Sequence, residues 1–181
     1  VIGDSVVVVG AGPIGLLVMQ VCLTAGASKV FVVEPLKKRR ELAKKLGANL
    51  VFDPAAVDPG KEIAKITEGL RADIAFDCVG NQSAFNTALK VTGRRGVICV
   101  AGLALKPIEV PFIKLWGHEK ELTFSSGYEN EFPAAIALLA NGKIDIDSMV
   151  STRIKLDDLV EKGIKPLVND GGKYVKILVD I

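Results

Sequence analysis

The chain has 181 residues, of which 49% are hydrophobic and 24% are charged, and its formal net charge is +2. This length allows one full domain with a modest appendage, and the composition excludes a disordered or low-complexity protein. So small a net charge gives no indication of a nucleic-acid or membrane surface. The cysteines Cys22, Cys78 and Cys99 are odd in number and lie in apolar segments, which predicts reduced thiols and a cytoplasmic protein.

The first predicted element is a strand over residues 5–9, a run of valines that leads directly into the turn Gly10-Ala11-Gly12-Pro13-Ile14-Gly15. An apolar helix over 14–25 follows this turn. Residues 5–28 carry no charge and are numerous enough to imitate a membrane span. Glycines and a proline in the middle of this stretch favour a buried strand-turn-helix unit instead, so no membrane segment is predicted.

Each residue type in the turn has a structural reason to occupy its position. Gly10 lets the chain turn sharply after the strand, Gly12 leaves the backbone open to a pyrophosphate, and Gly15 lets the helix pack close to the sheet. Pro13 suits the first helical turn, where its missing N–H costs nothing. The free N–H groups and the positive end of the helix dipole would then face the pyrophosphate. This pattern predicts a dinucleotide site.

Glu34 follows the second predicted strand, over 29–33, about 20 residues beyond the turn. Its carboxylate is suited to accept hydrogen bonds from both hydroxyls of an adenosine ribose, and its charge would repel a 2'-phosphate. NAD is therefore predicted in preference to NADP. The next predicted helix, over 36–46, ends at Gly47 and carries the basic run 37–40. A solvated helix face explains this run, while a 2'-phosphate clamp that would give NADP use stays open as an alternative.

Further strands are predicted at 50–52, 73–76, 96–101 and 121–125, and further helices at 62–68, 83–91 and 131–140. Alternation of strand and helix predicts an α/β fold, a Rossmann-type doubly wound six-stranded parallel sheet with the strand order 3-2-1-4-5-6. A short helix at 156–163 and a strand at 174–179 are not needed to complete that sheet, and could pair with a part that this chain lacks. The predicted domains are thus 1–147, which binds the dinucleotide, and the C-terminal segment 148–181.

The loops after the fourth and fifth strands are the next candidate positions, because the ligand of a doubly wound sheet lies across the carboxyl ends of its strands. These loops contain Asp77-Cys78-Val79-Gly80 and Ala101-Gly102-Leu103. Their small and apolar residues would let a flat nicotinamide ring approach the backbone. Cys78 is predicted to pack as a small hydrophobe under the cofactor, because no His or Lys adjoins it in sequence.

Several segments of the chain resemble the medium-chain, zinc-containing alcohol dehydrogenases. These segments are Gly10–Gly15, the strand end at Glu34, Glu41–Ala48, Asp77–Gly80 and Phe132–Asp145. The resemblance covers essentially the whole chain. Its tail, with Lys155–Gly163 and Val175–Val179, looks most like butanediol dehydrogenases, with sorbitol and threonine dehydrogenases close behind.

The resemblance implies a cofactor role for each residue of the predicted site. The implied contacts are Gly12, Pro13 and Ile14 with the pyrophosphate, Glu34 with the adenosine ribose, Arg39 near the adenosine, Cys78 and Val79 with the nicotinamide ribose, and the backbone of Ala101, Gly102 and Leu103 with the carboxamide. The expected function is the NAD-binding portion of a zinc-dependent dehydrogenase that transfers hydride between a secondary alcohol or diol and NAD. A stand-alone NAD(H)-binding sensor without catalysis is the alternative.

In the family that the chain resembles, Cys, His and an acidic residue of an N-terminal catalytic domain bind the zinc. None of those motifs is present in this sequence, and its single histidine, His118, is predicted to be a loop or surface residue. No catalytic residue and no metal ligand are therefore expected in this chain. The absence of an initiator methionine and the C-terminal segment without a partner favour a piece of a longer protein. Because it lacks the zinc ligands, this piece is expected to be inactive alone. Because relatives pair through the sixth strand, here around 122–126, a homo-oligomer (dimer or tetramer) is expected.

Overall fold

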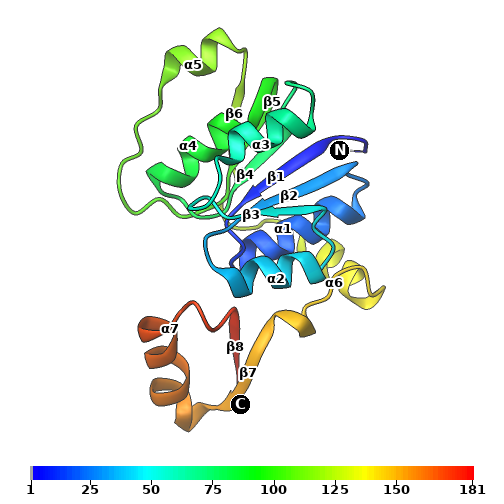
Figure 1. Ribbon diagram of the computed structural model, residues 1–181. Coiled ribbons are helices and arrows are strands. Elements are labelled where there is room, and N and C mark those ends of the chain that lie inside the picture. Colours follow the sequence, from blue (N-terminus) through cyan, green and yellow to red (C-terminus); the bar gives the residue numbers. More distant parts are fainter. Residues whose placement is uncertain (1) are drawn as a thin grey trace.

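The computed structural model describes residues 2–181 and contains a six-stranded parallel sheet (Figure 1). The order of its strands is β3-β2-β1-β4-β5-β6, which confirms the predicted Rossmann-type topology. The strands are β1 (Ser5–Val9), β2 (Lys29–Val33), β3 (Leu50–Phe52), β4 (Ala72–Asp77), β5 (Thr92–Val100) and β6 (Glu121–Phe124). The crossover connections bring the carboxyl ends of the strands to one edge of the sheet.

Helices cover both faces of the sheet because its central strands are apolar on both sides. Val7 and Val9 of β1 belong to the core that includes side chains of α3 (Pro59–Ile66) and α4 (Gln82–Val91). Val6 and Val8 face the other core, with side chains of α1 (Pro13–Thr24) and α2 (Lys37–Lys45). Figure 1 shows these two helix pairs on opposite sides of the sheet. The alternation along β1 thus divides the interior into two apolar layers.

The remaining helices are α5 (Phe112–Gly117), α6 (Phe132–Ala140) and α7 (Lys165–Asn169). Helix α5 was not expected from the sequence; it follows Pro111 and comprises only six residues. Helix α3 begins three residues before its predicted start. The Asp58 carboxylate caps that helix by accepting hydrogen bonds from the N–H groups of Gly60 and Lys61, and Pro59 occupies its first turn. An Asp-Pro pair is a common signal for the start of a helix, and it explains why α3 begins at Pro59.

The C-terminal segment forms its own two-stranded parallel sheet from β7 (Val150–Lys155) and β8 (Lys176–Asp180). The final strand therefore has a partner within this chain, although β7 was not predicted because its sequence is largely polar. The helix expected at 156–163 is a 3-10 turn over Leu156–Asp158 followed by a π-helix over Leu159–Ile164. In Figure 1 this unit lies beside the six-stranded sheet rather than within it.

Hydrogen bonds and packing hold the residues on both sides of position 147 to the sheet domain. The side chain of Gln20 in α1 accepts a hydrogen bond from the Asp145 N–H at 2.7 Å and donates one to the Asp145 carbonyl at 3.2 Å. Met149 is buried in the core beside α1 and α2. The boundary after residue 147 therefore falls in a segment that is fastened to the sheet domain.

Two further expectations concern membrane-spanning segments and the state of the cysteines. No helix within residues 2–181 has the length and apolar character needed to cross a membrane. The three cysteines are free thiols, as predicted.

Candidate functional site

The turn between β1 and α1 has the backbone geometry that its glycines predict. Gly10 has a φ of +93°, and a Cβ there would lie 2.5 Å from Cγ2 of Val79. A Cβ on Gly15 would collide with the carbonyl oxygen of Gly10, so the helix can approach the turn only with glycine at this position. Pro13 begins α1, and Ile14 is half exposed in its first turn.

Gly12 differs from the other two glycines of the turn because it faces open space. A Cβ on Gly12 would have a single neighbour within 4 Å, Nη1 of Arg39 at 3.9 Å. The N–H groups at the start of α1 therefore lie beside a space into which an anion can enter, with a guanidinium next to it. Such a space beside a helix N-terminus is suited to an anionic group.

Glu34 lies at the carboxyl end of β2 and is 3% exposed. One carboxylate oxygen accepts a hydrogen bond from the Ala11 N–H at 2.7 Å, and the other accepts one from the Leu36 N–H at 2.9 Å. Glu34 thus fastens the glycine turn to the start of α2, a role that the sequence analysis did not assign to it. Because each carboxylate oxygen has a further lone pair, these bonds leave capacity for a ribose hydroxyl.

Arg39 extends from α2 towards both the glycine turn and the C-terminal segment. Its Nη2 donates hydrogen bonds to the carbonyl oxygens of Gly171 at 2.8 Å and Tyr174 at 3.4 Å. Its Nε is buried and has no hydrogen-bond partner among the described residues. Sequence reasoning placed Arg39 near the adenosine but missed its contact with the C-terminal segment, because the two positions are more than 130 residues apart.

The loops after β4 and β5 are held together by Asp77, which the sequence analysis quoted without giving it a role. Oδ1 of this fully buried residue accepts hydrogen bonds from the N–H groups of Val79 at 2.9 Å and Gly80 at 3.0 Å. Its backbone carbonyl accepts hydrogen bonds from the N–H groups of Ala101 at 2.9 Å and Gly102 at 2.8 Å. One residue therefore fixes the backbone of both loops.

Close backbone packing between these loops explains their glycines. A Cβ on Gly102 would collide with the backbone of Val79 and Gly80, and a Cβ on Gly80 would lie 2.6 Å from the carbonyl carbon of Leu103. Gly80 also has a φ of +77°. The predicted residues Val79, Ala101, Gly102 and Leu103 thus come together at the carboxyl ends of β4 and β5.

Cys78 packs against the apolar core beside α1 and α2, as predicted. Burial and the neighbouring Asp77 raise the pKa of its thiol to about 12. The thiol is therefore protonated at neutral pH and is a poor nucleophile. This agrees with a packing role.

A pocket of about 610 Å³ lies beside these loops. Its lining includes Ala101, Gly102 and Leu103 after β5, together with Phe124 at the end of β6. The lining is largely apolar, and the Leu103 side chain is 79% exposed. Such a pocket suits a flat, weakly polar ring with its edge groups bonded to the backbone.

The described residues contain no group of three or more His, Cys, Asp and Glu side chains that could hold a metal ion. His118 is exposed at the C-terminal end of α5, just before the amino end of β6, as expected for a loop or surface residue. Taken together, the glycine turn, Glu34 and the two loops form one continuous line along the carboxyl edge of the sheet, where doubly wound folds bind nucleotides.

Comparison with known proteins agrees with this geometry. The family model for zinc-binding dehydrogenases matches residues 13–141. The (R,R)-butanediol dehydrogenase of Bacillus subtilis is 34% identical over 98% of this chain, and its crystal structure superposes with a TM-score of 0.91 over 99% of the chain. This chain spans about half the length of the curated relatives that it matches, 51% in the case of the B. subtilis enzyme.

Two similar structures were solved with bound cofactors. A zinc-binding dehydrogenase from Sinorhizobium meliloti with NADP is 27% identical, with a TM-score of 0.90 over 99% of this chain and 53% of its own. An alcohol dehydrogenase from Escherichia coli CFT073 with NADH is 25% identical, with a TM-score of 0.90 over 99% of this chain and 52% of its own. By its matched residues and its similarity to these enzymes, the chain belongs to the zinc-binding dehydrogenase family.

Proposed function

We propose that this chain is the NAD-binding portion of a zinc-dependent alcohol or polyol dehydrogenase that transfers hydride between a secondary alcohol or diol and NAD. The observation that carries the proposal is the glycine turn with Glu34 beside it. Gly12 leaves room for a pyrophosphate at the start of α1, and the carboxylate of Glu34 lies at the end of the neighbouring strand. The assignment of a diol as the substrate rests on the B. subtilis relative.

The residues of this chain would bind and orient the cofactor. The N–H groups of Gly12, Ile14 and Gly15 would donate to the pyrophosphate, with Arg39 beside them, and Glu34 would accept hydrogen bonds from the adenosine ribose. The loops that Asp77 fixes would hold the nicotinamide between Val79 and the backbone of residues 101–103. When bound, NAD supplies the hydride acceptor itself.

The residues present do not fit the zinc that the family name implies. The part of the chain that the structure describes has no metal-ligating cluster, and His118 lies near the opposite edge of the sheet. We assign the zinc ligands, and with them most of the alcohol pocket, to a further domain of the protein. The chain alone is then expected to bind cofactor without turnover.

A calorimetric titration with NADH and then NADPH tests the cofactor assignment. We expect saturable binding of NADH and much weaker binding of NADPH, because the Glu34 carboxylate would repel a 2'-phosphate. Replacing Glu34 with Ser should raise the affinity for NADPH. If the basic run 37–40 were instead a 2'-phosphate clamp, NADPH would bind the unaltered chain well and Glu34→Ser would change that affinity little.

The β6 edge of the sheet supports a proposed pairing between two copies of the protein. Strand β6 pairs only with β5 among the described strands, and Phe124 at its end is 71% exposed. An uncovered edge of this kind is suited to extend a sheet into a second copy. Sedimentation of the full protein as a monomer at high concentration would contradict this pairing.

A further inference from the structure

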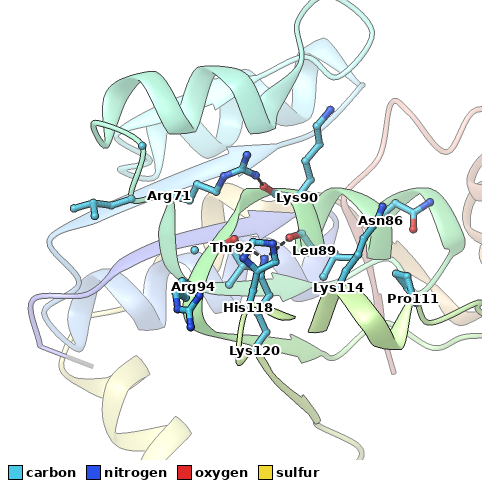
Figure 2. Close-up of a pocket in the computed structure, with 13 residues that line it drawn as sticks. Arg71, Asn86, Leu89, Lys90, Thr92, Arg94, Pro111, Lys114, His118 and Lys120 are labelled. Atoms are coloured by element: carbon cyan, nitrogen blue, oxygen red, sulfur yellow. Dashed lines mark hydrogen bonds between the residues drawn. The ribbon is translucent and has the colours of Figure 1, made fainter. Parts of the chain in front are cut away.

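A second pocket lies at the amino edge of the sheet, opposite the cofactor site (Figure 2). It has a volume of about 750 Å³ and is bordered by the starts of β4 and β5, the end of α4 and the segment from Pro111 to Lys120. The cofactor residues follow the other ends of the same strands. The two sites therefore lie at opposite ends of these strands and are separated by the strand length.

The lining of this pocket is strongly basic. Six side chains with cationic or titratable nitrogen contribute to it, and none of the thirteen lining residues is acidic. The six are Arg71, Lys90, Arg94, Lys114, His118 and Lys120. They come from four separate parts of the chain, so the cluster is a product of the fold rather than a basic run in the sequence.

Carboxylates outside the lining neutralise only part of this charge. Asp58 forms an ion pair with Lys90, and Glu119 forms ion pairs with Arg94 and Arg95. Arg71, Lys114 and Lys120 have no ion-pair partner among residues 2–181. The pocket therefore retains the charge of three cations in a concave surface, which concentrates a positive potential.

Capping of α4 accounts for part of the arrangement. The ammonium group of Lys120 donates hydrogen bonds to the carbonyl oxygens of Leu89 at 2.7 Å and Thr92 at 2.6 Å, and Nη1 of Arg71 donates to that of Lys90. Cations are favourable at a helix C-terminus. Two cations at one helix end nevertheless repel each other, and burial together with Arg71 lowers the pKa of Lys120 to about 8. Lys114 does not cap α4, so helix capping does not explain why its side chain lines the pocket.

Backbone strain is also concentrated around this pocket. Within the described chain, four residues other than glycine have a left-handed backbone: Glu68 at φ 52°, Arg71 at 67°, Arg95 at 57° and Glu119 at 52°. Each of them is a lining residue or the immediate neighbour of one. Such conformations are unfavourable for L-residues and cluster at ligand sites, because the surrounding structure must hold them in place.

We propose that this basic pocket binds a small phosphate-bearing molecule at a site distinct from the cofactor site. The phosphate would lie between Lys114, Lys120 and the guanidinium of Arg71, whose planar N–H groups match phosphate oxygens in pairs. The volume of the pocket is sufficient for a diphosphate or a phosphorylated metabolite. The anion would relieve the repulsion between Arg71 and Lys120.

Calorimetric titration of the purified protein with inorganic pyrophosphate, at constant ionic strength, tests this proposal. We expect saturable binding that persists when the cofactor site is filled with NADH. Replacing Lys114 with Gln should weaken it about tenfold, since one charge-assisted hydrogen bond is lost. Because Lys114 is exposed and has no partner in the described chain, this variant should fold normally. Lys114→Arg, which keeps the charge, should retain most of the affinity.

Lys29→Gln is the matched control, because Lys29 is an exposed lysine at the same edge of the sheet but in β2, two strands from β4. Absence of saturable binding, or an equal loss in the Lys29 and Lys114 variants, would overturn the proposal. Complete displacement of pyrophosphate by NADH would also contradict the proposal, because the pyrophosphate would then have been bound at the glycine turn. Failure of NADH to bind would contradict the proposed function and leave the comparison of the Lys114 and Lys29 variants intact.

Discussion

The two edges of the sheet differ in what forms their binding surfaces, which is the backbone at one edge and side chains at the other. The carboxyl edge is built from backbone: four glycine positions (10, 15, 80 and 102) lack room for a Cβ, and buried carboxylates hold the surrounding N–H groups in place. The amino edge is built from long cationic side chains that converge from several segments. A backbone site tolerates almost no change of shape, whereas a side-chain site loses affinity one contact at a time. This contrast predicts which variants have large effects and which have small ones.

Replacing Gly15 with Ala should have the largest effect. Its Cβ would collide with the carbonyl oxygen of Gly10, so either the glycine turn or α1 has to move. We expect a loss of about 3 kcal/mol or more in the free energy of unfolding, together with loss of NADH binding. Chemical denaturation and calorimetry measure the two effects. Gly117→Ala is the control, since a Cβ there would meet nothing within 4 Å; equal stabilities for the two variants would contradict the proposed packing.

Asp77→Ala should be the next most damaging change at the carboxyl edge. It removes the acceptor for the N–H groups of Val79 and Gly80, and it leaves the buried N–H of Gly80 without a partner. We expect a loss of about 2 kcal/mol in stability and weaker NADH binding, because the loop beside the nicotinamide would no longer be fixed. Asp77→Asn keeps a carbonyl oxygen as acceptor and should restore most of the affinity. Unchanged NADH affinity in the Ala variant, measured by calorimetry, would show that Asp77 does not position the loop.

The same contrast explains how much could be predicted from the sequence. The strand order and the glycine turn were predictable, because they depend on local patterns such as the valines of β1 and the spacing from Gly10 to Glu34. The contacts of Arg39 with residues 171 and 174 were not, because they join positions far apart in the chain. The basic pocket was missed for the same reason, since Arg71 and Lys120 meet only after β4, β5 and β6 have paired. The strand β7 was missed because polar residues hide its pairing with β8.

Arg39→Met tests whether the cofactor edge is connected with the C-terminal segment. The change removes the hydrogen bonds to the carbonyl oxygens of Gly171 and Tyr174, and we expect a loss of about 1 kcal/mol in stability. Limited proteolysis should then cut within residues 170–175 faster than in the unaltered chain. Arg153→Met removes an exposed ion pair with Asp180 in the same segment and serves as the control, with little expected effect. Equal rates of cleavage in both variants would show that Arg39 does not fasten the loop.

The smallest expected effect is a pH dependence of stability that originates at the amino edge. Burial and Arg71 lower the pKa of Lys120 from 10.5 to about 8, so between these values the unfolded chain binds more protons than the folded one. The free energy of unfolding should therefore rise with pH from about 8 upwards. The useful window ends below pH 9, because burial raises the pKa of the Cys22, Cys78 and Cys99 thiols, which ionise around pH 9 in the unfolded chain and less in the folded one, and this lowers stability. Urea denaturation between pH 7.5 and 8.5 should show the rise in the unaltered protein and its loss in Lys120→Met. Bound pyrophosphate should suppress the rise as well, because an anion beside Lys120 favours its charged form. A rise of the same size in Lys120→Met would assign the pH dependence to another group.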